Sequence, residues 1–123
     1  MNIAVEQRGG SKVAVIESTE LLISSVQDAL DLMASVSYSH GCYKMLINKS
    51  NLAEEFFDLS TRLAGEILQK YTNYQIKLAI VGDFDGYGSK SLKDFIYECN
   101  HGKQFFFLKD RDAALDALHS TSN

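Results

Sequence analysis

The chain has 123 residues, of which 46% are hydrophobic and 23% are charged, and its formal charge at pH 7 is −4. This size and composition predict one soluble globular domain over residues 1–123, whose core needs neither a disulfide nor a metal for support. Lysine and arginine are scattered along the chain. We therefore expect neither nucleic acid nor an anionic membrane as a partner, since both are recognised by concentrated positive charge.

The ends and the cysteines of the chain point to a compartment. Residues 1–7 lack a basic segment followed by an apolar one, so they do not resemble a signal peptide. The best apolar run, 76–81, has the length of a strand and not of a membrane span. Cys42 and Cys99 have no paired spacing and are expected to be reduced. Together these features predict a cytoplasmic protein.

The first half of the chain predicts a hairpin, a helix and a strand. Two β-like runs, 3–5 and 12–16, flank a glycine-containing spacer. Ser24 or Ser25 is placed to cap a helix whose apolar positions recur at helical spacing as far as Gly41. Residues 43–47 then predict a strand.

The second half alternates between helical and strand patterns. Residues 52–71 predict a helix, with a break near Leu59 as an alternative. The run 76–81 is typical of a central strand covered on both faces. A helix follows over 92–99, then a strand over 104–108, and Asp110 or Asp112 is placed to cap a last helix.

This order of elements predicts an α/β fold. Strands that alternate with helices imply right-handed crossovers and a mixed, mostly parallel sheet of about five strands with about four helices. The first two strands, joined by a short turn, supply the antiparallel pair.

Two stretches of the sequence resemble a known family. They are FDLSTRLAGEI at 57–67 and AIVGDF at 79–84, the latter followed by SKSL at 89–92. The chain resembles, over nearly its whole length, a bacterial family of domains of unknown function, the one numbered forty-one eighty. The resemblance implies a bacterial, cytosolic α/β protein, and it brings no assigned activity, catalytic residue or cofactor.

The order of elements is also similar to that of the STAS domains (sulfate transporter and anti-sigma antagonist). In those domains a helix start presents a phosphorylatable serine next to an aspartate. The comparable stretch here is FFDLST at 56–61, where Leu59 separates Asp58 from Ser60. The likeness is one of architecture, and it leaves open whether Ser60 or Thr61 is phosphorylated.

The stretch VGDFDGYGSKS at 81–91 is the first candidate site, because open α/β sheets bind ligands where their parallel strands end. The candidate ligand-binding residues are Asp83, Asp85, Ser89, Lys90 and Ser91. Their spacing does not fit a Walker A loop. A phosphotransfer pair of aspartates and an anion-binding helix start are the functional alternatives. The structural alternative is that Asp85 or Ser89 caps the helix and the glycines form the turn.

The second candidate is a charged stripe formed by Asp58, Arg62 and Glu66, spaced four residues apart. On one helix they would share a face that could bind a partner, or they would form an exposed ladder of ion pairs. Gly65 lies inside the same segment, which suggests close packing against a neighbouring backbone.

No thiol, imidazole or carboxylate pattern predicts a metal site, a catalytic residue or a cofactor. We therefore expect an interaction module that binds an unknown protein partner or forms a homo-oligomer. The alternative is a small-anion-binding protein or enzyme that uses the loop Asp83–Lys90.

Overall fold

The structure, a computed structural model, describes residues 1–122 and contains one five-stranded sheet with the order β1-β2-β3-β4-β5. The strands are β1 (Asn2–Arg8), β2 (Ser11–Glu17), β3 (Lys44–Asn48), β4 (Lys77–Val81) and β5 (Phe105–Leu108). β1 pairs with β2 in antiparallel fashion, and the remaining pairs are parallel. The predicted α/β fold with a mixed, mostly parallel sheet is confirmed.

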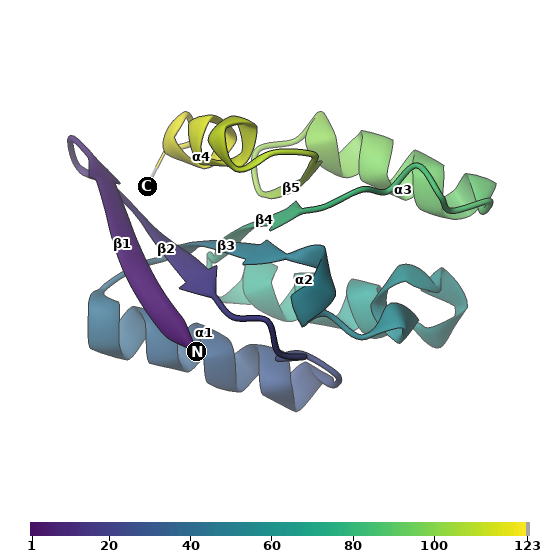
Figure 1. Cartoon of the computed structure of the whole chain (residues 1–123), viewed down its shortest axis with the longest axis horizontal. Helices are drawn as coiled ribbons and strands as arrows, with labels where there is room; N and C mark the ends of the chain where they lie inside the picture. Colours follow the sequence, from purple (N-terminus) through teal and green to yellow (C-terminus); the bar gives the residue numbers. More distant parts are fainter. Residues whose placement is uncertain (123) are drawn as a thin grey trace.

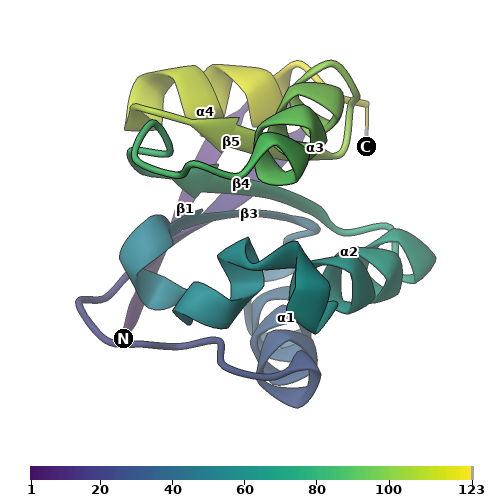
Figure 2. The same ribbon diagram turned by 90° about the vertical axis from the view of Figure 1, so that its right-hand side faces the viewer.

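Four helices cover the two faces of this sheet unequally (Figures 1 and 2). They are α1 (Val26–His40), α2 (Leu63–Asn73), α3 (Lys90–Asn100) and α4 (Arg111–His119). Because the strands are ordered in space as they are in sequence, right-handed crossovers carry α1, α2 and α3 to the same face. α4 follows the last strand and packs on the opposite face.

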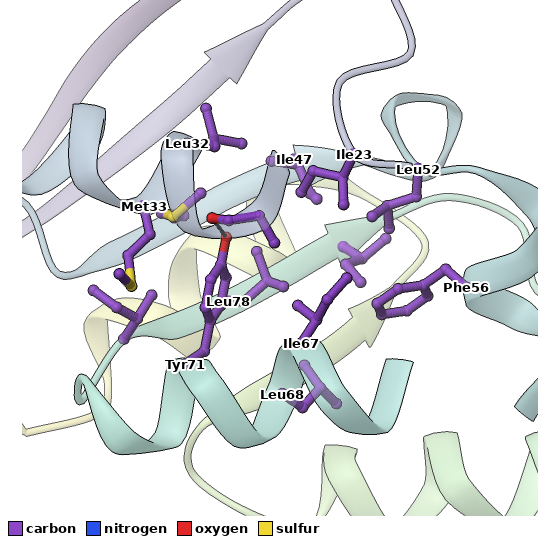
Figure 3. Packing of buried hydrophobic residues seen from close by; sticks show 14 of the residues in the cluster. Ile23, Leu32, Met33, Ile47, Leu52, Phe56, Ile67, Leu68, Tyr71 and Leu78 are labelled. Atoms are coloured by element: carbon purple, nitrogen blue, oxygen red, sulfur yellow. Dashed lines mark hydrogen bonds between the residues drawn. The ribbon is translucent and has the colours of Figure 1, made fainter. Parts of the chain in front are cut away.

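The core therefore has a large and a small layer. In the large layer, alternate strand residues such as Met45 and Leu78 meet α1 and α2, as Figure 3 shows in part. Tyr71 of α2 is fully buried there, and its hydroxyl donates to the carbonyl of Ala29 over 2.7 Å. The other strand residues, such as Leu46, form the small layer with α4.

Helix ends follow the local chemistry of the sequence. Ser25 caps α1 by accepting a hydrogen bond from the amide of Asp28, and Gly41, with φ 62°, ends that helix. Asp110 caps α4 in the same way through the amide of Ala113. In both cases the structure selects one of the two capping residues that the sequence offered. β3 lies one residue later than predicted.

The alternative of a break near Leu59 is confirmed, whereas a continuous helix over 52–71 is wrong in its first half. Three 3-10 helices replace it, η1 (Lys49–Asn51), η2 (Glu54–Phe57) and η3 (Leu59–Thr61), and α2 begins only at Leu63. The Asp58 carboxylate accepts from the amide and the hydroxyl of Ser60, while the Thr61 hydroxyl donates to backbone carbonyls. Such bonds compete with an α-helix, and Arg62 then adopts a left-handed φ of 65°.

Gly65 and Gly82 differ in how closely other segments pack against them. The close packing predicted at Gly65 is wrong, because a Cβ built there would meet no atom within 4 Å. At Gly82, directly after β4, a Cβ would lie 2.5 Å from the Cβ of Lys49. The close approach of two segments is therefore located at Gly82.

Candidate functional site

We call the edge where β2–β5 end the carboxyl edge, and the predicted loop lies there, between β4 and α3. The Asp83 carboxylate accepts a hydrogen bond from the amide of Asp85 over 2.9 Å, and this bond closes a tight turn. The Asp85 carboxylate pairs with Lys109 over 2.6 Å, and Lys90 pairs with Asp94 over 2.7 Å. These ion pairs raise the pKa of both lysines.

The start of α3 is capped within the chain. The Ser89 hydroxyl oxygen accepts a hydrogen bond from the amide of Leu92 over 3.2 Å. Of the two capping residues proposed from the sequence, Asp85 and Ser89, the structure thus selects Ser89. Ser91 is exposed in the first turn of α3. The five predicted residues thus extend from the turn after β4 into the first turn of α3, and four of them already bond within the chain.

An aromatic cluster packs beneath this turn. The rings of Phe57 and Tyr87 stack with centroids 5.4 Å apart, and the Lys49 ammonium lies 4.6 Å from the centroid of the Tyr87 ring. Lys49 also donates to the carbonyl of Asp83, and the Tyr87 hydroxyl donates to Glu54 over 3.2 Å. Burial raises the pKa of Tyr87. These contacts pack the loop after β4 against the segment of η1 and η2.

The predicted interaction face is divided by the break before α2. Asp58 lies at the junction of η2 and η3, with its carboxylate bonded to Ser60. Arg62 directly precedes α2, and Glu66 lies in the first turn of that helix. The one-helix stripe is therefore not formed, but Arg62 and Glu66 remain together on one hollow.

This hollow, the α2 groove, has a volume of about 650 Å³ and is bordered by α1, η3, α2 and α3. Its floor is apolar, formed by the half-buried Val26, Leu59 and Phe95, and Gly65 leaves it open. Arg62, Glu66 and other polar residues form the rim. Within residues 1–122, neither Arg62 nor Glu66 forms an ion pair.

A second hollow lies at the edge of the sheet opposite the carboxyl edge, where β2–β5 begin, and we call it the amino-edge pocket. Its volume is about 700 Å³. It is lined by the starts of β2, β3 and β4, the end of α2, the loops before β2–β5 and the segment after α4. The lining residues are Gly10, Lys12, Gly41, Tyr43, Lys44, Thr72, Tyr74, Gln75, Lys77, Gln104 and Ser122. Three of these residues are lysines, and none is acidic.

Lys44 is the most buried of the three lysines, with 3% of its surface exposed. Its ammonium donates to the Ser11 hydroxyl over 2.9 Å and to the carbonyl of Thr121 over 3.0 Å, and both acceptors are neutral. Burial lowers the pKa of Lys44, and the nearby charge of Lys77 lowers it further. Burial also lowers the pKa of Lys77, whose ammonium donates to the carbonyl of Ser122.

A chain of polar contacts continues from Lys44 under α4. Ser11 Oγ lies 2.7 Å from His119 Nδ1, and His119 Nε2 lies 3.3 Å from Glu6 Oε2. A serine, a histidine and a carboxylate in contact have the residue types of an activated nucleophile. Here Ser11 is only 9% exposed, and its oxygen accepts a hydrogen bond from the Lys44 ammonium. We therefore interpret this series of polar contacts as one that holds the Lys44 side chain in place.

Sequence reasoning missed this pocket although part of its signal was present. Lys44 and Lys77 are the first residues of two neighbouring parallel strands and are paired in register. Parallel strands bring their first residues to the same edge, so two such lysines predict a positive patch. The contact between Ser11 and His119 spans nearly the whole chain and has no local signal.

The remaining thiols and imidazoles do not assemble a metal site. Both cysteines are free, Cys42 buried and Cys99 half-buried, and burial raises the pKa of Cys99 to about 11. Throughout the described part of the chain, no three histidine, cysteine or acidic side chains form a group that could hold a metal ion. No helix there combines the length and hydropathy that a membrane crossing needs.

The fold and its hollows define a small α/β domain with a mostly parallel sheet. The model of a family described as a domain of unknown function, DUF4180, matches residues 8–118, so the chain belongs to this family. Neither a curated protein nor a solved structure matches the chain.

Proposed function

We propose that this domain is a bacterial, cytoplasmic, STAS-like module that acts by self-association, and that the α2 groove is the interface. The observation that carries the proposal is an apolar floor with Arg62 and Glu66 on one rim, two exposed charges of opposite sign that form no ion pair within residues 1–122. The family and the predicted order of elements support the other parts of this proposal.

A surface with both signs of charge can complement a second copy of itself. In a twofold dimer each contact occurs twice, so Arg62 of one protomer would meet Glu66 of its partner and the reverse. The half-buried Val26, Leu59 and Phe95 would be covered at the same time. Such interfaces place an apolar centre within a polar rim, as the groove does.

Charge reversal tests this interface. We expect Arg62→Glu and Glu66→Arg each to weaken self-association about tenfold, because like charges would then face each other. The double variant restores the pairing and should recover most of the loss. Lys103→Glu and Glu17→Arg reverse exposed charges that do not line the groove and serve as matched controls. Sedimentation equilibrium measures the dissociation constants.

Two results would overturn the proposal. One is a wild-type chain that sediments as a monomer at every concentration tested. The other is a double variant that is as weak as the sum of the two single variants, because the two charges would then not pair across the interface.

Anion binding at the loop Asp83–Lys90 is the alternative, and the geometry supports it less. Asp83, Asp85, Ser89 and Lys90 already bond within the chain, so an anion would have to compete with these contacts. Asp83→Ala and Lys90→Ala test it by titration with inorganic phosphate. Binding that both variants abolish would favour the loop over the interface as the functional site.

A further inference from the structure

We propose that the amino-edge pocket binds a small phosphorylated organic molecule, with its phosphate on Lys12, Lys44 and Lys77 and its organic part against Tyr43 and Tyr74. This site lies at the opposite edge of the sheet from the loop Asp83–Lys90. It also shares no lining residue with the α2 groove, so this proposal can be tested independently of the proposed interface.

The first argument is the charge of the pocket. The chain as a whole carries a formal charge of −4, yet the pocket collects three lysines and no acidic residue. Over residues 1–122 no carboxylate pairs with any of these lysines. Elsewhere in the chain Lys90 and Lys109 each have an acidic partner. Among the described residues, the pocket is thus a local concentration of positive charge without acidic partners.

The second argument is the burial of that charge. A buried ammonium is costly unless it is paired. Lys44 is almost completely buried, and within residues 1–122 its ammonium has a hydroxyl and a carbonyl as its acceptors. Lys77 lies beside it on the neighbouring strand, in register. Burial lowers the pKa of both lysines, and the charge of Lys77 lowers that of Lys44 further. A phosphate with two negative charges would compensate both.

The third argument is the shape and lining of the pocket. Its volume of about 700 Å³ lies within the range of small-molecule sites. Tyr43 and Tyr74 are 58% and 59% exposed and present aromatic surface at its wall. Gln75 holds a left-handed φ of 59°, which non-glycine residues seldom adopt, and such conformations cluster at ligand sites. These features favour an organic anion over a bare ion.

Calorimetric titration of the full chain tests the site with three probes at matched ionic strength. The probes are phenyl phosphate, inorganic phosphate and benzoate. We expect phenyl phosphate to bind at least tenfold more tightly than inorganic phosphate, and benzoate to bind more weakly than phenyl phosphate. Equal binding of phenyl phosphate and inorganic phosphate would overturn the organic part, and tighter benzoate binding would overturn the phosphate. No binding of any probe would overturn the site.

Lysine variants locate the binding. Lys77→Met and Lys12→Met should each weaken phenyl phosphate binding at least tenfold, and neither residue is fully buried, so folding should be retained. Lys90→Met and Lys109→Met remove the same charge at the carboxyl edge and should leave binding unchanged. Equal losses in all four variants would show a general charge effect and overturn the assignment. Tyr74→Ala should weaken phenyl phosphate binding and leave inorganic phosphate binding unchanged.

Discussion

The two edges of the parallel sheet use the same residue types in opposite ways. At the carboxyl edge, Asp85 pairs with Lys109 and Ser89 caps α3. At the amino edge, Lys44 and Lys77 lie side by side with neutral acceptors only, among the contacts of residues 1–122. Aspartate, serine and lysine near a turn thus often form hydrogen bonds and ion pairs within the chain itself. A charged group without a charged partner is the stronger indication of a ligand.

The largest effect at the carboxyl edge is expected from Gly82→Ala. The new Cβ would lie 2.5 Å from the Cβ of Lys49, so one segment must shift. We expect a loss of about 1–3 kcal/mol in the free energy of unfolding, measured by urea denaturation. Gly86→Ala is the matched control, because a Cβ there meets no atom within 4 Å. An equal loss in both variants would refute a steric cause.

At the amino edge, Lys44→Met is expected to stabilise the free protein by about 1–2 kcal/mol, because an apolar side chain of similar length replaces a buried cation whose acceptors within residues 1–122 are neutral. The folded pKa of Lys44 lies below its ordinary 10.5. The unfolded chain therefore binds the proton more tightly, and wild-type stability rises as pH increases from the lowered pKa towards 10.5.

The difference in unfolding free energy between Lys44→Met and wild type should accordingly shrink over that pH range. Taking the difference removes the titration of Tyr71 and other groups common to both proteins. Thermal and urea denaturation at several pH values measure it. A variant that is less stable than wild type at neutral pH would show that Lys44 already has a stabilising partner within the chain.

Ser89→Ala should cost about 1 kcal/mol, since it removes the cap of α3. Ser89→Thr keeps an oxygen at the cap and should lose less. Phenyl phosphate binding should be the same in all three proteins, because the cap lies at the carboxyl edge. A binding defect in Ser89→Ala, without a stability defect, would move the ligand site to that edge.

The smallest effect is expected from Asp85→Asn. Its ion pair with Lys109 is 70–71% exposed on both sides, so solvent and salt screen it. We expect the midpoint of urea unfolding to remain unchanged at both low and high salt. A drop in the midpoint that disappears at high salt would mean that the pair contributes more than its exposure suggests.

Local chemistry explains which parts of the fold could be predicted. The hairpin and the end of α1 at Gly41 depend on residues close in sequence and were predicted correctly, and Ser25, the cap of α1, is one of the two capping residues that were proposed. The segment 52–61 was not, because apolar spacing there resembles a helix while Asp58 and Thr61 bond the backbone in 3-10 turns. The spacing of apolar residues does not reveal such competing hydrogen bonds.

Candidate sites were harder to predict, because a site depends on what each group finds in space. The turn between β4 and α3 lies where the sequence predicted it, but the ion pair of Asp85 with Lys109 could not be read from a separation of 24 residues. The pocket at the amino edge joins Lys12, Lys44 and Lys77 from three strands, and the support of Lys44 by Ser11 and His119 comes from both ends of the chain. Only the folded structure shows that these cations lack an acidic partner among the described residues.

Titration of the isotopically labelled chain with phenyl phosphate, followed by amide NMR shifts, tests the contrast between the two edges most directly. The structure predicts saturable shifts at the start of β2, β3 and β4, around Lys12, Lys44 and Lys77, and none at Ser89–Ser91. Shifts centred on Ser89–Ser91, with the amino edge unchanged, would contradict the account.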